Sequence, residues 1–396
     1  MILILIHGLA FIYYVMNKKK VSFIFALPLR TSPILITMPF GLNIIQILDK
    51  KDYKIDVFLS EYRNDSYENI FSKNVSIHFI DQNYLWRNKV TLAYFMVTKY
   101  FKLKTLFKLR NKYELIFGTG MAGITLAAIL KQYNNKSKFI YLNDEFPIHD
   151  KKTIWAESEI ASALKADLVV TPDESRFSPL CKQIPGLEKI DNFTLPNTPL
   201  ISDIDSVPII DWHKYFGISK NKKLFLAAGG INDTYLISDL LESLNEWPKD
   251  AILILKSKNK INDFNRSINQ LHLKDKVIWV NESYSLDKLH SLIKYCTASI
   301  CLYKNEGDNI YYMGKSSGKI MRSIALGRPV ISSDFPSLKF IELLKIGKLV
   351  STSTEIVEAI EFIMDNNDKL KENCEKNYNQ ISYENYWSIF EKELFQ

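Results

Sequence analysis

Continuous apolar runs of about four to eight residues alternate with segments of helical periodicity along most of this 396-residue chain. Runs without polar alternation are typical of strands that are buried on both faces of a parallel sheet. Because helical segments separate the runs, the pattern predicts an α/β fold. The runs are 21–29, 55–59, 75–80, 113–117, 138–142 and 166–170 in the first half, and 223–228, 251–255, 277–280, 298–303, 329–332 and 348–351 in the second.

The alternation stops once, between residues 190 and 218, where three prolines lie among polar residues. We interpret this stretch as a linker between two consecutive doubly wound domains of similar size. Ligands of open parallel sheets bind at the carboxyl ends of the strands, so two such domains are expected to share a cleft. Aromatic and aliphatic residues at helical spacing predict a terminal amphipathic helix at 382–396.

The amino-acid composition narrows the classes of protein to which this chain can belong. A hydrophobic fraction of 47%, with only 14 glycines and 13 prolines, argues against a disordered or low-complexity chain. The 51 basic and 44 acidic residues give a net charge of +7, which is too small to indicate nucleic-acid binding but fits an anionic substrate or membrane surface. The four cysteines form no Cys-x-x-Cys pair, which favours a reducing cytoplasm. No histidine, cysteine and aspartate cluster has metal-ligand spacing, so we expect no bound metal.

Two segments suggest contact with the cytoplasmic face of a membrane. Residues 1–16 are almost entirely apolar, slightly short for a spanning helix, and lack the charge order of a signal peptide. They are either a membrane anchor or an extended start before a true initiator at Met16. Residues 99–112 combine six basic residues with an apolar side. Such a helix either lies on an anionic leaflet or packs on its domain with a solvated basic rim.

The most informative motif is a short run of small residues that leads into an apolar helix in the second half. A lysine follows the small residues, and Gly327 ends the helix before a buried strand. Backbone N–H groups at a helix N-terminus, serine hydroxyls and an ammonium group together form a diphosphate site. An ordinary capped helix with a solvated lysine is the alternative. The residues that would bind the diphosphate are Ser316, Ser317, Gly318 and Lys319.

In its context this motif resembles the donor-nucleotide region of GT-B glycosyltransferases, most of all family 4 and its relatives. The motif, the turn at Gly327 with the strand after it, and Pro336 carry the likeness. It covers roughly residues 17–396, and it is fairly specific after Leu224 and diffuse before Lys138. The other segments that share it are 166–173, 195–197, 226–231, 276–280 and 286–295.

The resemblance implies an α/β fold of the GT-B type, with two facing Rossmann-like, doubly wound domains and a cleft between them. Residues 17–200 would bind the acceptor and residues 201–381 the nucleotide sugar, with the helix 382–396 packing back on the first domain. The implied activity moves a sugar from a nucleotide diphosphate sugar to a hydroxyl of a glycan or lipid-linked acceptor, with retention and without a metal or cofactor. The implied setting is bacterial cell-surface polysaccharide or lipopolysaccharide synthesis, in the cytoplasm or on the inner face of the cell membrane.

Further site residues follow from their positions after predicted strands. Gly229 and Gly230 would let the backbone approach phosphate closely, and Lys256 would add a cation. A carboxylate at Asp144 or Glu145 would face the acceptor and act on its hydroxyl or on an oxocarbenium-like transition state. Helix capping or a salt bridge in a loop is the alternative. The residues expected to meet the acceptor are Arg30, Thr31 and Gly120.

The chain departs from the family pattern at one place. Family 4 members usually carry two glutamates, at the positions that Gly314 and Arg322 occupy here. The second glutamate normally receives the ribose hydroxyls, so the resemblance implies that this chain holds its nucleotide differently. Glu306 and Asp308, in a longer loop nearby, are the substitutes we consider.

A second glycine motif raises a rival function. Gly118, Gly120 and Gly123 open a predicted helix, and acidic residues follow about twenty residues on, as in the nucleotide site of an NAD(P)-dependent oxidoreductase. The motif lies about ninety residues after the first strand rather than at the first turn, which favours a tight turn that packs a helix on a strand. A sugar-nucleotide epimerase of GT-B fold and an inactive scaffold also stay open as interpretations.

Overall fold

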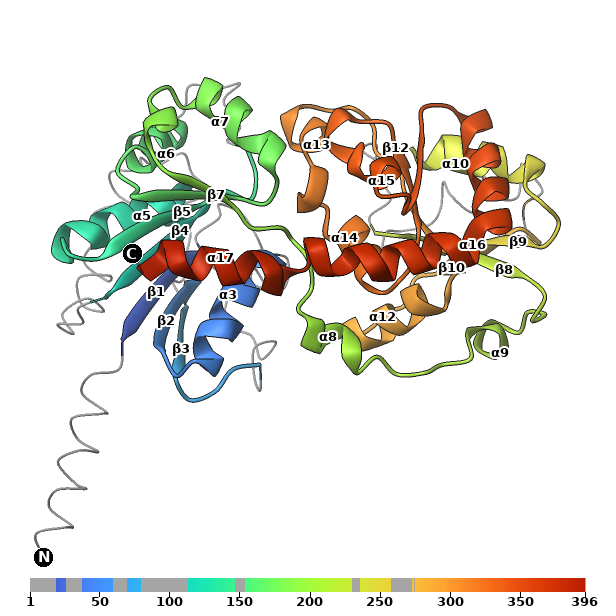
Figure 1. The fold of residues 1–396 in the computed structure, drawn as a ribbon, viewed down its shortest axis with the longest axis horizontal. Helices are drawn as coiled ribbons and strands as arrows, with labels where there is room; N and C mark the ends of the chain where they lie inside the picture. The colour runs from blue at the N-terminus through green and yellow to red at the C-terminus, as the bar shows by residue number, and fades with distance from the viewer. Residues whose placement is uncertain are drawn as a thin grey trace, which may run out of the picture. The chain divides into compact units, whose positions relative to one another are not determined.

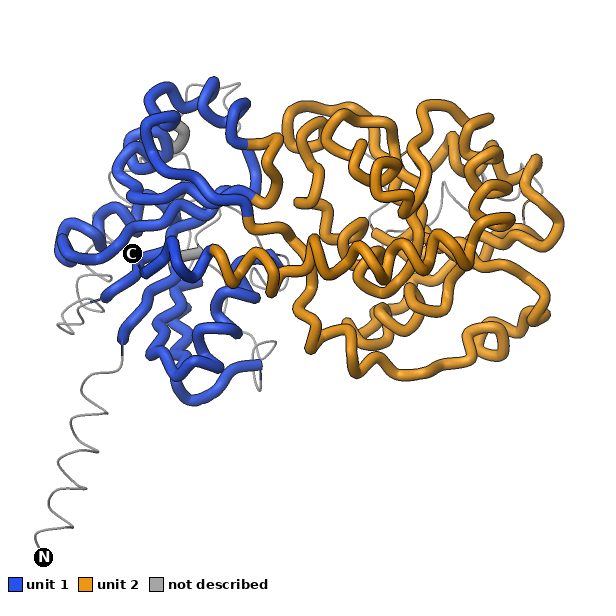
Figure 2. Tube along the Cα trace, viewed as in Figure 1, with its two compact units in different colours: residues 1–171, 177–194, 390–396 blue, residues 172–176, 195–389 orange. Residues whose placement is uncertain are grey.

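The computed structural model divides the chain into two compact units (Figure 2). Unit 1 comprises residues 1–171, 177–194 and 390–396, and unit 2 comprises residues 172–176 and 195–389. Each unit is therefore described by itself. The residues that the structure describes are 19–25, 38–59, 70–79, 113–146, 154–229, 236–257, 273 and 275–395.

Unit 1 is built on a seven-stranded sheet with the strand order β3-β2-β1-β4-β5-β6-β7 (Figure 1). All of its paired strands run parallel. In its core the rings of Phe23 and Phe117 stack across β1 and β4, with centroids 4.3 Å apart. The strands are β1 (Lys20–Phe25), β2 (Lys54–Leu59), β3 (Val75–Phe79), β4 (Leu115–Thr119), β5 (Lys138–Leu142), β6 (Leu168–Thr171) and β7 (Asn192–Thr194). The α-helices are α3 (Pro39–Lys50), α5 (Gly120–Tyr133), α6 (Ile154–Ala163) and α7 (Phe177–Gln183).

Unit 2 contains a six-stranded sheet with the order β10-β9-β8-β11-β12-β13, again with parallel pairs. Buried aliphatic residues on both of its faces pack against the helices. The strands are β8 (Lys223–Ala228), β9 (Ala251–Lys256), β10 (Val277–Val280), β11 (Ala298–Cys301), β12 (Val330–Ser333) and β13 (Gly347–Val350). The α-helices are α8 (Ile201–Asp205), α9 (Trp212–Phe216), α10 (Ile237–Ser243), α12 (Leu286–Tyr295), α13 (Asp308–Tyr311), α14 (Gly318–Ala325), α15 (Phe340–Leu343) and α16 (Ser353–Ile381). The last helix, α17 (Tyr383–Phe395), begins in unit 2, and its residues from 390 on belong to unit 1.

The two sheets confirm the α/β prediction, because every apolar run in the sequence overlaps one parallel strand. The stretch 190–218, interpreted as a linker, is not without structure, since it contains β7, α8 and α9. These elements have three, five and five residues, too few to produce a recognisable period. β7 forms because it pairs with β6, a contact that local sequence does not reveal.

The strand order reverses once in each sheet, between β1 and β4 in unit 1 and between β8 and β11 in unit 2. On the two sides of such a point the chain leaves the strands in opposite directions, which opens a crevice at their carboxyl ends. Each unit therefore has one edge position at which a ligand is expected.

Close packing of α5 on β4 explains the glycine at position 118. A Cβ atom there would lie 2.6 Å from the Cβ of Ala127 and 2.9 Å from the Cα of Ile124. Both separations are shorter than real Cβ contacts, so only glycine lets the helix approach the strand this closely. The structure thus gives Gly118 a packing role.

The chain ends in unit 1. The long helix α16 ends at Ile381, Ser382 is its C-cap, and α17 begins at Tyr383. Near its end, Phe390 packs on Phe193 of β7 with ring centroids 5.1 Å apart, and Phe395 lies 5.6 Å from the ring of Tyr53. Aromatic contacts thus fix the last turns of α17 on the first sheet.

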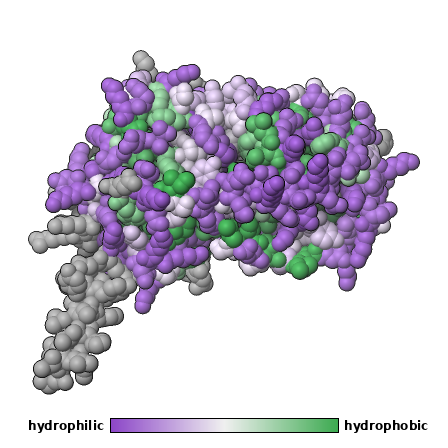
Figure 3. All heavy atoms as spheres, in the orientation of Figure 1, coloured by the Kyte–Doolittle hydropathy of each residue, from purple (hydrophilic) through white to green (hydrophobic). Residues whose placement is uncertain are grey.

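The face drawn in Figure 3 is largely hydrophilic, and its hydrophobic side chains form small separate patches. Within the described part of the chain, no helix combines the length and the apolar content needed to cross a bilayer. Residues 1–16 and 99–112, where the sequence suggests membrane contact, lie outside that part. Membrane contact stays a prediction.

Replacing Gly118 with alanine should lower the free energy of unfolding of unit 1 by about 1–3 kcal/mol, because the added methyl group overpacks the contact between β4 and α5. Urea denaturation followed by circular dichroism measures the change. Gly318→Ala is the matched control, since its methyl group would lie 3.5 Å from Nδ2 of Asn197, an ordinary contact. If Gly118→Ala is as stable as the wild type, the contact is not tight.

Candidate functional site

A cavity of about 370 Å³ opens in unit 2 at the switch point between β8 and β11. Strand β9 and the helices α12 and α14 supply its other walls. The volume falls within the range of small-molecule sites, about 300–1,000 Å³. Its apolar lining residues are Leu226, Ala228, Leu289 and Ile293, and its hydroxyl and thiol groups come from Ser257, Ser299, Ser323 and Cys301.

Three basic side chains, from Lys256, Lys319 and Arg322, line this cavity, and none of the described residues around it is acidic. Lys319 lies directly against the backbone of Gly229, because a Cβ atom at position 229 would lie 2.2 Å from the lysine Nζ. Nζ of Lys319 also lies 5.7 Å from the ring centroid of Tyr303. The glycine therefore makes room for the ammonium group, and the charges of the cavity favour an anionic ligand.

The helix α14 positions two of these cations. Ser317 stands at its N-cap, and the Ser317 hydroxyl lies 2.9 Å from the hydroxyl of Tyr303. Lys319 and Arg322 are three residues apart, so they project from the same side of the helix one turn from each other. The positive end of the helix dipole adds to their charge. The residues that hold the opposite face of α14 in the core are Ile320, Met321 and Ile324.

Arg322, the residue at the position of the missing second glutamate, faces this cavity. Among the described residues its Nε atom has no hydrogen-bond partner. His290 is fully buried and its Nδ1 lies 3.1 Å from the carbonyl oxygen of Asp203. Burial, and secondly the charge of Arg322, lower the pKa of His290 to about 4. His290 is therefore neutral at pH 7, and Arg322 stays protonated although burial lowers its pKa. Neither Glu306 nor Asp308, the substitutes considered, lines the cavity.

The structure brings together part of the expected donor site. Gly229, Lys256 and Lys319 all line the cavity. The other three described residues of the set do not line it but lie at the start of α14 or just before it. Gly230 lies outside the described residues. The three that do not line the cavity are Ser316, Ser317 and Gly318.

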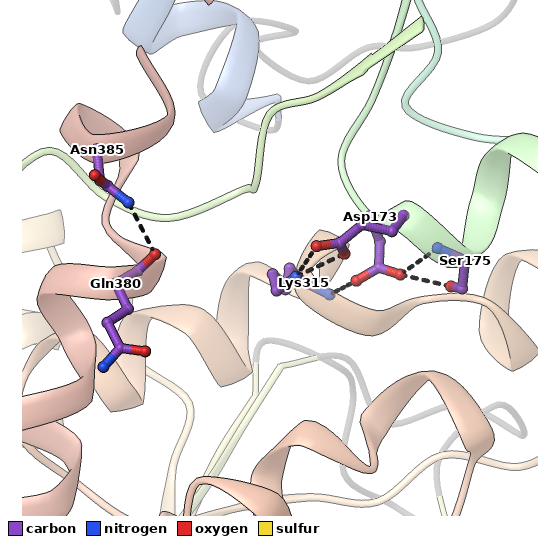
Figure 4. A network of polar contacts seen from close by, with 6 residues as sticks. Asp173, Ser175, Lys315, Gln380 and Asn385 are labelled. Atoms are coloured by element: carbon purple, nitrogen blue, oxygen red, sulfur yellow. Dashed lines mark hydrogen bonds and ion pairs between the residues drawn. The ribbon is translucent and has the colours of Figure 1, made fainter. Parts of the chain in front are cut away.

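The contacts of Asp173 explain why position 314 carries no side chain. The carboxylate of Asp173 accepts the backbone N–H of Lys315 at 2.7 Å and the backbone N–H of Ser175 at 2.9 Å (Figure 4). A Cβ atom on Gly314 would lie 2.1 Å from Oδ2 of Asp173, and the φ of Gly314 is +44°. A glutamate at position 314 would collide with this carboxylate.

A small recess of about 30 Å³ lies in unit 1, after the ends of β4 and β5. It brings together Gly120, Asp144 and Glu145, which the sequence assigned to the acceptor side. Gly120 has a φ of +68°, a conformation that favours glycine. Arg30 and Thr31 lie outside the described residues. The remaining residues of the recess are Met38, Thr119, Tyr141, Leu142, Asn143 and Glu159.

Glu159, which sequence reasoning missed, is the buried carboxyl group of this recess, with 2% of its surface exposed. Tyr141 donates its hydroxyl proton to Oε1 of Glu159 at 2.6 Å, and Nδ2 of Asn143 donates to the Tyr141 hydroxyl at 2.9 Å. Burial raises the pKa of Glu159 to about 7, against the opposing effect of the Tyr141 hydrogen bond. The one sequence feature that could have indicated Glu159 is its spacing of three and four residues from Ser162 and Ala163, which places all three on one helix face. All three are buried in the structure.

Within the described part of the chain, no group of three or more histidine, cysteine, aspartate or glutamate side chains is placed to hold a metal ion. Cys301 is the thiol of the larger cavity, and burial raises its pKa to about 11. It is therefore protonated at neutral pH and is a poor nucleophile.

Comparison with known proteins identifies the fold. No family model and no curated protein sequence matches the chain. Sucrose-phosphate synthase from Thermosynechococcus elongatus matches with a TM-score of 0.73 and 14% identity over 96% of this chain and 99% of its own. HepE of Anabaena, solved in complex with UDP and glucose, matches with a TM-score of 0.69 and 13% identity over 95% of this chain and 99% of its own. WaaG, a glycosyltransferase involved in lipopolysaccharide biosynthesis, matches with a TM-score of 0.62 and 12% identity over 91% of this chain and 95% of its own.

These three proteins have the GT-B fold, and the matches span nearly the whole chain. The fold predicted from the motif around Lys319 is therefore confirmed. At identities of 12–14% the likeness establishes the fold alone.

The stability of unit 1 should depend on pH through Glu159. Its pKa in the folded chain, about 7, lies above the ordinary 4.5, so its contribution is complete below pH 4.5 and is lost as the pH rises to about 7. The loss is roughly 3 kcal/mol. Glu159→Gln should abolish this pH-dependent loss of stability, so the variant should gain stability relative to the wild type between pH 5 and 7 in urea denaturation. Glu157→Gln, on the exposed side of α6, is the control. If the stability difference between Glu159→Gln and the wild type does not change with pH, Glu159 is not the source of the pH dependence.

Arg322→Gln should raise the pKa of His290 from about 4 towards its ordinary 6.5, because it removes the charge that opposes protonation. Burial remains, so the value should stay below 6.5. Titration of the imidazole signals by NMR measures the shift. Lys256→Gln removes a charge from the same cavity that does not act on His290 and serves as the control. An unchanged pKa of His290 in Arg322→Gln would show that the two groups are not coupled.

Proposed function

We propose that this protein is a glycosyltransferase that binds a nucleotide diphosphate sugar in unit 2 and transfers the sugar to a hydroxyl of a glycan or lipid-linked acceptor. The observation that carries the proposal is the cavity at the β8–β11 switch point, where Lys256, Lys319 and Arg322 gather without an acidic residue among the described lining. The apolar side chains of Leu289 and Ile293 offer a surface for a base. Cations beside an apolar surface match a nucleoside diphosphate.

The chemistry places its largest electrostatic demand on the leaving group. When the bond between the sugar C1 and the phosphate oxygen breaks, negative charge develops on the diphosphate. Lys319, fixed against Gly229 at the start of α14, is positioned to stabilise that charge. We propose that Ser316, Ser317, Gly318 and Gly230 complete the diphosphate site. By the family resemblance, we also propose a retaining transfer that needs no metal or further cofactor.

The acceptor side belongs, in this proposal, to unit 1. Asp144 and Glu145 border the recess there with Gly120, and they are the proposed groups that face the acceptor. Arg30 and Thr31 are proposed to add contacts. The involvement of WaaG in lipopolysaccharide biosynthesis supports that pathway as the setting, and the proposed location is the cytoplasm or the inner face of the membrane.

One rival function loses support, and a second needs a separate experiment. An oxidoreductase would use the glycine turn after β4, but Gly118 already has a packing role there, and the recess beside the turn is about 30 Å³, far smaller than the about 300 Å³ from which small-molecule sites start. A sugar-nucleotide epimerase would bind the same donor. Incubation with the donor alone separates the epimerase, because only that enzyme would form a new sugar nucleotide without an acceptor.

Thermal unfolding in the presence of UDP, GDP, CMP or NAD tests the donor site. One nucleoside diphosphate should raise the melting temperature of the wild type, because binding to the folded state stabilises it. UDP is the first choice, since HepE was solved with UDP. Lys319→Ala should lose the shift, whereas Lys376→Ala, on the exposed side of α16, should keep it. A shift with NAD alone that survives in Lys319→Ala would overturn the proposal.

A further inference from the structure

We propose that the recess in unit 1 binds one hydroxyl group of an uncharged sugar, held by Glu159, Thr119 and Asn143. The proposal rests on the proposed glycosyltransferase function and names the class of its acceptor, a neutral sugar rather than a phosphorylated or carboxylated one. It assigns a binding role to three residues that sequence reasoning left aside.

Three residues that line the recess each carry a buried side-chain oxygen atom without a partner in the described part of the chain. These atoms are Oε2 of Glu159, Oγ1 of Thr119 and Oδ1 of Asn143, and the three residues have 2%, 1% and 1% of their surface exposed. Thr119 stands at the N-cap of α5, yet its side chain makes no capping hydrogen bond. Buried polar atoms in native proteins are nearly always satisfied, so three unpartnered atoms on residues of one recess indicate a bound polar group.

The orientation of the three groups is fixed by their other contacts. The Tyr141 hydroxyl occupies Oε1 of Glu159, which leaves Oε2 for the recess. Both donors of the Asn143 amide are engaged, one by the Tyr141 hydroxyl at 2.9 Å and one by the carbonyl oxygen of Glu145 at 3.0 Å. The amide oxygen of Asn143 is therefore the atom that remains for a ligand.

The remaining donors and acceptors match a single hydroxyl group. With Glu159 protonated, Glu159 and Thr119 each offer an O–H donor, and Asn143 offers one acceptor. A hydroxyl group has two lone pairs and one proton, so it satisfies all three. The volume of about 30 Å³ exceeds the roughly 10–15 Å³ that a cavity needs to hold one water molecule and is far below the roughly 300 Å³ from which small-molecule sites start, so the recess takes a hydroxyl group while the sugar ring stays outside.

The charges around the recess select against anions. Its described lining contains three carboxyl groups, from Asp144, Glu145 and Glu159, and no basic side chain. A phosphate or carboxylate inside the recess would be repelled, because no described residue that lines it supplies the positive charge that such a ligand needs. The cavity of unit 2 has the reverse composition, with cations only. An uncharged sugar hydroxyl is the ligand that fits.

Proton occupancy of Glu159 should control this binding. The titratable groups that line the recess with Glu159 are Tyr141, Asp144 and Glu145, and none of them carries a positive charge. Loss of the proton removes a donor and leaves a buried charge without a counter-ion among the described lining. With a pKa of about 7 for Glu159, about one molecule in thirty is still protonated at pH 8.5. The apparent Kd should therefore rise about thirtyfold between pH 5.5 and 8.5.

Saturation-transfer NMR on the full chain tests the proposal with the methyl glycosides of glucose, galactose, mannose and N-acetylglucosamine. Glucose 6-phosphate and glucuronic acid are the anionic counterparts. At least one neutral glycoside should bind at pH 5.5 and weaken about thirtyfold at pH 8.5. Neither anion should compete with it. Binding of the anions alone, or binding that strengthens with pH, overturns the proposal.

Substitutions at position 159 separate a binding role from a structural one. Glu159→Gln keeps an N–H donor towards the recess and an acceptor for Tyr141, so it should bind the glycoside at pH 5.5 within about twofold of the wild type and lose the pH dependence. Glu159→Ala and Thr119→Val should weaken binding at least about tenfold, since each removes a donor. Glu157→Gln, on the exposed side of the same helix, should behave like the wild type.

The outcomes distinguish this proposal from the donor site. If no glycoside binds, or if Glu159→Ala leaves binding unchanged, the recess holds an ordered water only and the proposal fails. Nucleotide stabilisation that depends on Lys319 would survive that result, because Lys319 and its cavity belong to unit 2. If the wild type binds a glycoside but no nucleotide, the proposed donor is overturned instead.

Discussion

Parallel pairing of the strands is the constraint on which both sites depend. Because all strands of one sheet point the same way, their carboxyl ends lie along one edge, and the chain leaves that edge in opposite directions where the strand order reverses. The larger cavity uses the reversal between β8 and β11, and the recess of unit 1 follows the ends of β4 and β5 beside its own reversal. Side chains that are far apart in sequence, such as Lys256 and Lys319, line one cavity only because of this geometry.

Polar groups that are buried without enough hydrogen-bond partners determine the chemistry of each site. The carboxylate of Asp56 in unit 1, which has such partners, shows the contrast. Burial alone would raise the pKa of Asp56, but donors from His78 at 3.0 Å, Lys20 at 2.8 Å and Tyr113 at 2.7 Å outweigh it and lower the pKa to about 2. Glu159 is buried more deeply and receives one donor, so its pKa rises. A carboxylate with three donors is fixed in one charge state, whereas a carboxyl group with one donor can change its charge near neutral pH.

The sequence predicted the parts of the molecule that local pattern determines. Buried strands appear as apolar runs, and the two sheets confirm them, whereas the phosphate site indicated by small residues and Lys319 at a helix start stays a prediction. Glu159 and Arg322 were missed as site residues because their roles depend on burial by distant segments, which no local period encodes. The family pattern, which puts glutamates at 314 and 322, did not apply to this chain. Packing explains one change, since the carboxylate of Asp173 fills the space beside Gly314.

Arg322, at the position where the family pattern has its second glutamate, affects which ligand groups the cavity of unit 2 can bind. A glutamate there accepts hydrogen bonds from hydroxyl groups, whereas a guanidinium only donates. The ligand group beside Arg322 must therefore offer oxygen lone pairs, and a charged group would satisfy it best, because the neighbouring His290 is neutral and the described lining holds no carboxylate. The two sites thus divide the polar chemistry between them. In the proposed function, the cavity of unit 2 offers cations to an anionic donor, and the recess of unit 1 offers a protonated carboxyl group and an amide oxygen to a neutral hydroxyl. By these charges a phosphate is disfavoured in the recess of unit 1 and favoured beside the cations of the cavity in unit 2.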